Sequence, residues 1–339
     1  MIERVHKWVD DQLESAEQER ICAVALSKAE VHRFRQAVDE GFACEVATHR
    51  FARKELWQTE LSAGERTLYL MRTAQKMNPE LVFAGPSAAV AYGLSVSNRY
   101  LTQLWVKASP GTHRRNDAGV RSILVARDND ERVSDLRVTS RARTIGDCLR
   151  VMDFRAGLAV ADSALRTWST SWEDLWENVR EACPRMSGIH RVEGVVRLAN
   201  GRAESGGESI ARAVMLELGI APPVLQRVFT SPIDRELMYR VDFSWDVASG
   251  AILAELDGSE KYESPAMRGD RSVAQVIGDE HRRQSHIEAD QNVLRVIRFG
   301  LADAVRVDAF LRLLVGCGVP RTFAMDECVL RAGGVLRCR

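Results

Sequence analysis

The stretch that most constrains the fold covers residues 240–262 and reads RVDFSWDVASGAILAELDGSEKY. Its first part alternates the apolar residues Val241, Phe243 and Trp245 with polar ones, which is the period of a half-buried strand. A turn of small residues follows at 248–250, and a second apolar run then ends in acidic residues. Two short runs of this kind around such a turn predict a β-hairpin.

Three carboxylates lie on this hairpin. Successive side chains of a strand point to opposite faces, so Glu255 and Asp257 share one face while the apolar residues between them pack on the other. If Asp242 pairs beside Glu255, the three acids lie within one strand spacing, about 5 Å. Such acids repel one another unless a cation neutralises them, and oxygen ligands suit Mg²⁺ or Mn²⁺. The alternative is that they are the solvent-facing acids of an ordinary hairpin.

The order of elements around the hairpin favours the metal site. A helix that carries Glu208 and an apolar strand at 224–229 precede it, and a charged helix and the strand 293–299 follow it. In this order, residues 201–303 resemble the compact nuclease domains related to the very-short-patch-repair (Vsr) endonuclease, a branch of the PD-(D/E)XK superfamily. The matching residues are Glu208, Gln226, Asp242 in VDF, Glu255 and Asp257 in ELDG, Lys261, Tyr262, Glu280, Arg283 and Arg298 in VIRF.

The resemblance implies a metal-dependent endonuclease that hydrolyses DNA phosphodiester bonds. Asp242 and Glu255 are expected to hold Mg²⁺ or Mn²⁺, with Asp257 and Glu208 close by. The superfamily usually has a lysine two residues after the glutamate, where this chain has Asp257, so Lys261 is a candidate for orienting the nucleophile or the phosphate. The residues expected to contact DNA in this domain are Gln226, Arg282 and Arg283. The competing explanations are a solvated helix face for the arginines and a stabilising N-terminal charge for Glu208.

Composition limits the broad class of the protein. The 47 Lys and Arg residues balance 47 Asp and Glu residues, so any contact with nucleic acid must be a local patch. The seven cysteines are scattered and form no CxxC pair, which favours a reduced protein without structural zinc. No apolar run approaches the length of a membrane span or signal peptide. These features predict a cytoplasmic protein.

The N-terminal region predicts a winged helix. Residues 27–30 read SKAE, a capping box that opens a helix ending near Gly41, and a short hairpin follows at 42–53. Helix, helix and hairpin is the order of a winged helix, which would turn Arg33 and Arg35 towards DNA. Nearby acids dilute this basic patch, so a structural or protein-contact role is the alternative.

Residues 27–168 resemble the AbiEi-type antitoxins of type IV toxin–antitoxin systems. The resemblance rests on the degenerate winged helix, on SAAVAYGL at 87–94, on the basic loop at 109–115, and on RTIGDCLR and AVADSALR further along. Arg114 and Arg115 of that loop are expected to contact phosphates, with a solvated loop as the alternative. The usual glycine-rich wing is missing, which leaves DNA reading by this region open. A cognate toxin is a possible partner.

The expected fold class is α/β (α+β), with a winged-helix-like region at 1–80, an antitoxin-like middle domain at 81–200, and a nuclease domain at 201–339 with a mixed sheet flanked by helices. The glycine-rich segment 199–207 is the predicted boundary. The expected function is a Mg²⁺-dependent DNA endonuclease with a regulatory or DNA-binding N-terminal region. The first alternative is a non-catalytic DNA-binding regulator of antitoxin type, and the second is a protein-interaction scaffold.

Overall fold

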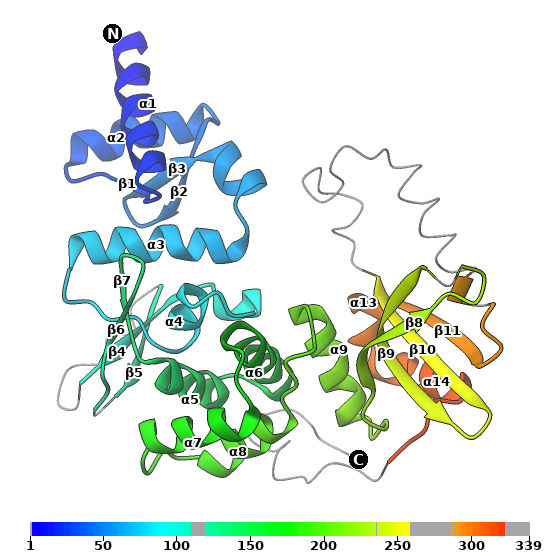
Figure 1. Cartoon of the computed structure of the whole chain (residues 1–339). Helices are drawn as coiled ribbons and strands as arrows, with labels where there is room; N and C mark the ends of the chain where they lie inside the picture. Colours follow the sequence, from blue (N-terminus) through cyan, green and yellow to red (C-terminus); the bar gives the residue numbers. More distant parts are fainter. Residues whose placement is uncertain are drawn as a thin grey trace. The chain divides into compact units, whose positions relative to one another are not determined.

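The computed structural model describes residues 2–109, 119–125, 127–234, 236–257, 286–287 and 289–322, with side chains from residue 7 onward. It mixes helices and strands, as expected for the α/β class (Figure 1). The chain divides into two compact units. Unit 1 comprises Met1–Met152 and Glu177–Ile189, and unit 2 comprises Asp153–Trp176 and His190–Arg339. No helix of the described part is long and apolar enough to cross a membrane.

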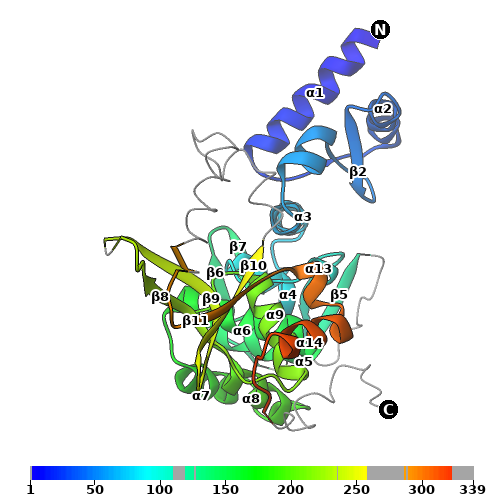
Figure 2. The same ribbon diagram turned by 90° about the vertical axis from the view of Figure 1, so that its right-hand side faces the viewer.

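Unit 1 begins with the elements of the predicted winged helix (Figure 2). They are α1 (Ile2–Gln18), β1 (Ala23–Val24), α2 (Lys28–Asp39), β2 (Ala43–Ala47) and β3 (Arg50–Arg53). The strands form a sheet in the order β1-β3-β2. Ser27 and Glu30 make the predicted capping box at the start of α2. Phe34 of α2 stacks on Phe51 of β3, with ring centroids 4.5 Å apart, at the centre of the small core.

The rest of unit 1 is built from short strands and helices. They are the π-helix η1 (Leu56–Glu60), α3 (Ala63–Met77), α4 (Gly85–Ala91), the 3₁₀ helix η2 (Asn98–Tyr100), β4 (Leu104–Ala108), β5 (Val120–Leu124), β6 (Glu131–Val133), β7 (Leu136–Val138) and α5 (Arg141–Val151). β4 and β5 run parallel, whereas β6 and β7 are antiparallel. Phe83 bridges Val106 and Val138, which links β4 to β7.

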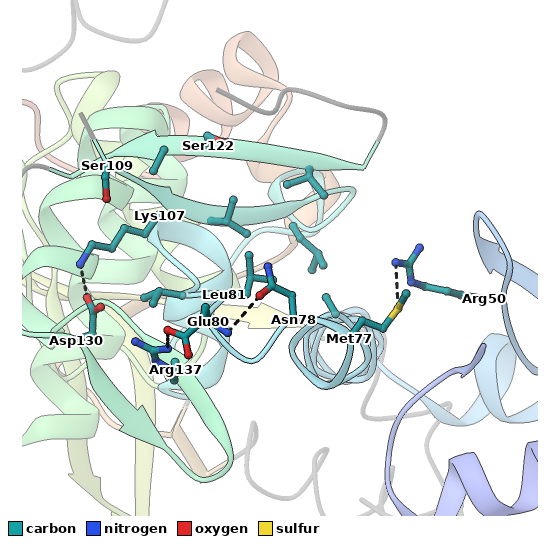
Figure 3. Close-up of a pocket in the computed structure, with 16 residues that line it drawn as sticks. Arg50, Met77, Asn78, Glu80, Leu81, Lys107, Ser109, Ser122, Asp130 and Arg137 are labelled. Carbon is teal, nitrogen blue, oxygen red and sulfur yellow. Dashed lines mark hydrogen bonds and ion pairs between the residues drawn. The ribbon is translucent and has the colours of Figure 1, made fainter. Parts of the chain in front are cut away.

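A cavity of about 620 Å³ lies beside β4 and β5 (Figure 3). We call it the β4–β5 cavity. It is lined by residues of both strands, the end of α3, the following loop, β3 and β7: Arg50, Ala74, Met77, Asn78, Glu80, Leu81, Val82, Leu104, Val106, Lys107, Ala108, Ser109, Val120, Ser122, Asp130 and Arg137.

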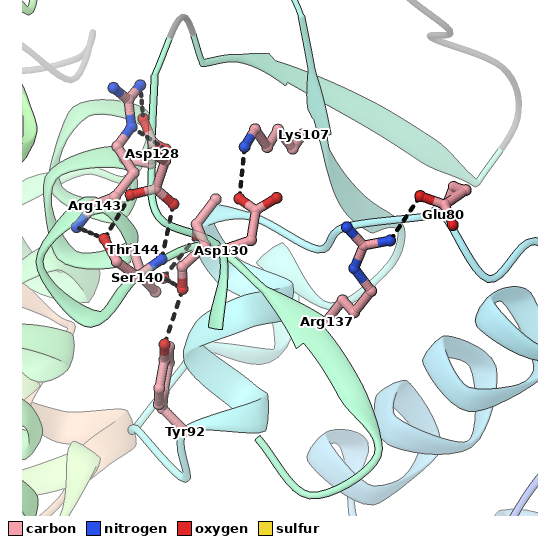
Figure 4. A network of polar contacts seen from close by, with 11 residues as sticks. Glu80, Tyr92, Lys107, Asp128, Asp130, Arg137, Ser140, Arg143 and Thr144 are labelled. Carbon is pink, nitrogen blue, oxygen red and sulfur yellow. Dashed lines mark hydrogen bonds and ion pairs between the residues drawn. The ribbon is translucent and has the colours of Figure 1, made fainter. Parts of the chain in front are cut away.

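A polar network surrounds the start of α5 (Figure 4). Arg143 donates to both carboxylate oxygens of Asp147 one turn along the helix, each at 2.9 Å. The Asp147 side chain is fully buried, and burial raises its pKa while the Arg143 hydrogen bonds oppose that rise. Ser140, the N-cap of α5, donates to Asp128 through its hydroxyl and its backbone N–H.

Unit 2 contains a four-stranded sheet with helices around it. Its elements are α6 (Phe154–Trp168), α8 (Ile189–Leu198), α9 (Gly206–Glu217), β8 (Val224–Thr230), β9 (Met238–Val247), β10 (Gly250–Asp257), β11 (Val293–Gly300), α13 (Leu301–Ala304) and α14 (Val307–Gly316); α7 (Trp172–Ala182) lies partly in each unit. The strand order is β11-β10-β9-β8, with β10 and β11 parallel and the other pairs antiparallel. Side chains of α9, α14 and the sheet form the main core, which includes Val214, Phe243, Phe299 and Phe310.

β9 and β10 form the predicted hairpin around residues 248–249. Gly250 opens β10 with φ of 150°, in the region that favours glycine. A Cβ atom there would lie 2.4 Å from the carbonyl oxygen of Asn292, which is far too close. Because glycine has no Cβ atom, the backbone at Asn292, which leads into β11, can lie directly beside the turn between β9 and β10.

The chain divides after Met152 rather than at the predicted boundary 199–207. Within unit 2, α6 and α9 pack against each other, and a buried ion pair joins them. Arg212 Nη2 lies 2.7 and 2.9 Å from the two carboxylate oxygens of Asp162, whose side chain is fully buried. The backbone N–H of Asn200 also donates to Asp162, at 2.7 Å. The helix α6, which precedes the predicted boundary, thus packs with α9, which follows it.

Candidate active site

Glu208 lies in the first turn of α9 and belongs to its N-terminal cap. Ser205, the N-cap residue, accepts a hydrogen bond from the backbone N–H of Glu208, and its hydroxyl donates to Glu208 Oε1 at 2.8 Å. The backbone N–H of Glu204 donates to Glu208 Oε2 at 2.9 Å. These contacts hold the nearly buried carboxylate in one orientation. The spacing S-x-x-E, present here as SGGE, is the sequence signal from which this cap could have been predicted.

Gln226 of β8 connects two of the predicted site acids. Its side-chain nitrogen donates to Glu208 Oε2 at 2.9 Å and to Asp242 Oδ1 at 3.2 Å. Its backbone has φ of 53°, a left-handed conformation that costs a residue with a Cβ atom about 1–2 kcal/mol. Strained residues of this kind gather at functional sites, where the surrounding structure keeps them in place.

The side-chain alternation of the sheet changes beside Gln226. Phe243 packs in the main core with Ile252, whereas Val241 packs in a separate cluster with Leu253, on the opposite face of β10. A regular β9 would place Val241 and Phe243 on one face, as the sequence pattern predicted. The prediction was wrong for Val241. The side chains of β9 do not alternate regularly at Asp242, so Val241 and Phe243 lie on opposite faces of the sheet.

Asp242 also contacts the neighbouring strand β10. Its Oδ2 accepts a hydrogen bond of 2.9 Å from the backbone N–H of Leu256. Leu256 lies between Glu255 and Asp257, the two acids that were predicted to share a face. The carboxylate of Asp242 is therefore held against the segment of β10 that carries both of them.

Glu255 and Asp257 share one cationic partner, Arg298 of β11. Glu255 and Arg298 are paired in the parallel register of β10 and β11. Arg298 Nη2 lies 2.9 Å from Glu255 Oε2, and Nη1 lies 3.2 Å from Asp257 Oδ1. The side chain of Glu255 is 7% exposed and that of Asp257 is 47% exposed, so one acid is enclosed and the other faces solvent. The prediction that both acids point to one side of β10 is confirmed. The sequence placed Arg298 in the VIRF motif but did not predict these two partners.

The four acids form two linked groups. Gln226 joins Glu208 to Asp242, and Arg298 joins Glu255 to Asp257. Among the residues that the structure describes, no group of three or more histidine, cysteine or acidic side chains is placed to hold a metal ion. The predicted cluster is thus not gathered around one point. Its carboxylate oxygens are still the donor type that fits Mg²⁺ or Mn²⁺.

Five further predicted site residues lie outside the described part of the chain. They are Lys261, Arg282, Arg283, Arg114 and Arg115.

Three arginines of α2 and β3, the elements of the predicted winged helix, are engaged in contacts within unit 1. Arg35 lies 3.3 Å from Glu45, and the guanidinium of Arg33 lies over the ring of Trp8. Arg53 forms ion pairs with Asp10 and Glu17. These contacts limit the basic surface that α2 and β3 offer to DNA.

Comparison with known proteins places the chain beside two uncharacterized proteins of Mycobacterium tuberculosis. They are MT2308 of strain CDC 1551 / Oshkosh and Rv2248 of strain ATCC 25618 / H37Rv. Each is 31% identical to this chain over 182 residues, which are 53% of this chain and 64% of the relative. The chain thus spans less than two thirds of the length of these relatives. No described protein family matches it, and no solved structure matches it.

Proposed function

We propose that this protein is a metal-dependent endonuclease that hydrolyses DNA phosphodiester bonds, and that its N-terminal region binds DNA or regulates the activity. One observation carries the proposal. Asp242 bonds both to Gln226, which also holds Glu208, and to the backbone of Leu256, between Glu255 and Asp257. Acids from three elements, α9, β9 and β10, therefore adjoin one segment of the sheet, where the motifs that resemble Vsr-like nucleases occur.

In this proposal Asp242 and Glu255 hold Mg²⁺ or Mn²⁺, with Asp257 and Glu208 close by. When bound, such a metal activates water and stabilises charge on the phosphoryl group. The contribution of the chain itself is to orient these acids. Gln226 fixes the carboxylates of Glu208 and Asp242, and the N–H of Leu256 fixes the second oxygen of Asp242. Fixed side chains of this kind reduce the reorganisation that catalysis requires.

The experiment compares two aspartates of β9. Asp242→Asn removes a proposed ligand, whereas Asp246→Asn changes an exposed acid that pairs with Arg227 on the neighbouring strand. Plasmid cleavage with Mg²⁺ or Mn²⁺, and with EDTA as the blank, is expected to fall at least about 100-fold in Asp242→Asn and Glu255→Gln, because metal catalysis supplies several kcal/mol. Asp246→Asn should cleave like the wild type. DNA affinity of the inactive variants should be retained, because remote phosphate contacts remain.

The alternative function is a DNA-binding regulator without catalysis. It is supported by the order of α1, α2, β2 and β3 in unit 1, which is the helix, helix and hairpin order expected of a winged helix. Cleavage by Asp242→Asn and Glu255→Gln at the wild-type rate, or no metal-dependent cleavage by the wild type, would select this alternative. A salt series of DNA affinity then locates the contact, since loss of a phosphate-binding cation such as Arg283 flattens the salt dependence.

A further inference from the structure

We propose that the β4–β5 cavity of unit 1 binds a small organic anion. A single anionic group would lie at Arg50, and an apolar body would lie along the strands. This inference does not depend on the nuclease proposal, because the cavity is formed by unit 1 alone.

The cavity has the size and wall of a ligand site. Its volume of about 620 Å³ lies within the range of about 300–1,000 Å³ that small-molecule pockets occupy. The apolar part of the wall comes from β4, β5, the end of α3 and the segment after it, and includes Leu104, Val106, Val120, Leu81 and Met77. Such a wall favours a ligand with a hydrocarbon or aromatic body.

The charges of the wall limit the ligand to one negative group. Lys107 Nζ lies 2.5 Å from Asp130 Oδ1, and Arg137 Nη1 lies 2.9 Å from Glu80 Oε2, so two of the three cations are already neutralised. Arg50 is the third cation. With three cations and two acids the wall has a formal charge of +1, which matches a monoanion rather than a polyphosphate.

Arg50 is available for such a group. One of its guanidinium nitrogens donates to the carbonyl of Thr48 at 3.2 Å, and the other lies 3.6 Å from the sulfur of Met77. Within the described residues it contacts no carboxylate. In Figure 3, Arg50 lies at one end of the cavity and the Lys107–Asp130 pair at the other, with Met77 between them.

The position of Arg50 gives the ligand a regulatory consequence. Arg50 opens β3 directly after the turn at His49, where φ is 58°. The rest of the wall belongs to α3 and to the middle of the chain. A bound anion would therefore join the hairpin of the winged helix to α3 and β4, and would stabilise this part of unit 1.

The test uses the full chain and two probes. The first is 8-anilinonaphthalene-1-sulfonate, an aromatic monoanion that fluoresces in apolar surroundings. The second is decanoate, which should displace it, with decanol as the uncharged match. Arg50→Gln should raise the dissociation constant of decanoate about tenfold, because a charged hydrogen bond contributes at least about that factor, and should leave decanol unaffected. Arg50→Lys should restore most of the affinity.

Two further variants locate the site. Ser122→Phe adds a ring on the wall of the cavity and should abolish displacement by decanoate, with an unchanged thermal melting curve showing that the variant is folded. Arg35→Gln removes an exposed arginine of α2 outside the cavity and should bind like the wild type. Equal decanoate affinity in the wild type and Arg50→Gln, or no saturable binding by the wild type, would overturn the proposal.

Discussion

Asp147 in unit 1 and Glu255 in unit 2 are both buried acids held by an arginine, but their surroundings differ. Asp147 and Arg143 lie one turn apart on α5, where Arg143 donates to both carboxylate oxygens and Arg150 of the same helix lies 3.7 Å from Asp147 Oδ1. Glu255 and Asp257 of β10 share Arg298 of the neighbouring strand β11, and the Asp257 side chain is partly exposed. We call Asp147 and Arg143 the closed pair, because both lie on one helix and are shielded from solvent. We call Glu255, Asp257 and Arg298 the open group, because it is partly exposed to solvent and joins two strands. A buried ion pair by itself therefore does not indicate a functional site, and the exposure of one partner to solvent distinguishes the second group from the first.

The largest effect is expected from breaking the closed pair. Asp147→Ala leaves Arg143 charged and largely buried, and should reduce the free energy of unfolding by about 3–5 kcal/mol. The matched change in the open group, Asp257→Ala, removes a partly exposed partner and should cost less than about 1 kcal/mol. Urea denaturation of both variants measures the difference. Similar losses for the two would contradict the distinction between a closed and an open group.

Arg298→Gln tests whether the open group needs a cation. Glu255 stays buried beside Asp257 and loses its ion pair with Arg298, so the free energy of unfolding should fall by about 2–3 kcal/mol. If the proposed metal site is correct, millimolar Mg²⁺ should restore part of this loss, and Arg298→Gln with Asp242→Asn should not respond. Denaturation of both variants with EDTA measures the loss of stability, and denaturation with Mg²⁺ measures how much of it the metal restores. Equal stability of Arg298→Gln in the two buffers would count against a metal at these acids.

Two substitutions of Gln226 can measure the backbone strain that its left-handed conformation causes. Gln226→Gly and Gln226→Ala both lose the amide that joins Glu208 to Asp242, but only glycine adopts a positive φ without a steric cost. The glycine variant should therefore be more stable than the alanine variant by about 1 kcal/mol. Both should cleave DNA more slowly if the amide orients the acids. If alanine is as stable as glycine, the left-handed backbone stores no strain.

The smallest effect concerns Glu65, an exposed acid at the start of a helix. Hydrogen bonds from the side chain and backbone of Ser62 lower the pKa of Glu65 at the start of α3. A lowered pKa means that the folded protein favours the ionised form. The stabilisation is therefore present above the unfolded pKa, about 4.3, and is lost as the pH falls through the folded pKa. Glu65→Gln should be less stable than the wild type by about 0.3–1 kcal/mol at pH 6, with the gap closing towards pH 3.

Local patterns in the sequence predicted much of the fold. The hairpin of β9 and β10 followed from a period of two around a small-residue turn, and the capping box of α2 followed from Ser27 and Glu30. The face shared by Glu255 and Asp257 followed from the same alternation. These features depend on residues close together in the chain, which is why the sequence alone was enough.

Features that depend on distant residues were not predicted. Asp162 and Arg212 lie 50 positions apart, and nothing in the glycine-rich segment between them indicates that they meet. The face change beside Gln226 was missed because glutamine is not a residue type that signals a positive φ. Arg298 was matched as part of a motif, but its two carboxylate partners emerged only from the register of β10 and β11.

The ion pair between α6 and α9 also decides where the chain can be cut. A fragment that starts at Gly201, where composition suggests a linker, would keep Arg212 but lose Asp162, and would expose the surface of α9 that α6 covers. A fragment that starts at Asp153 keeps the pair, and Asp153 is already the N-cap of α6. A fragment for recombinant work on unit 2 should therefore begin there, although it also carries Glu177–Ile189, which belong to unit 1.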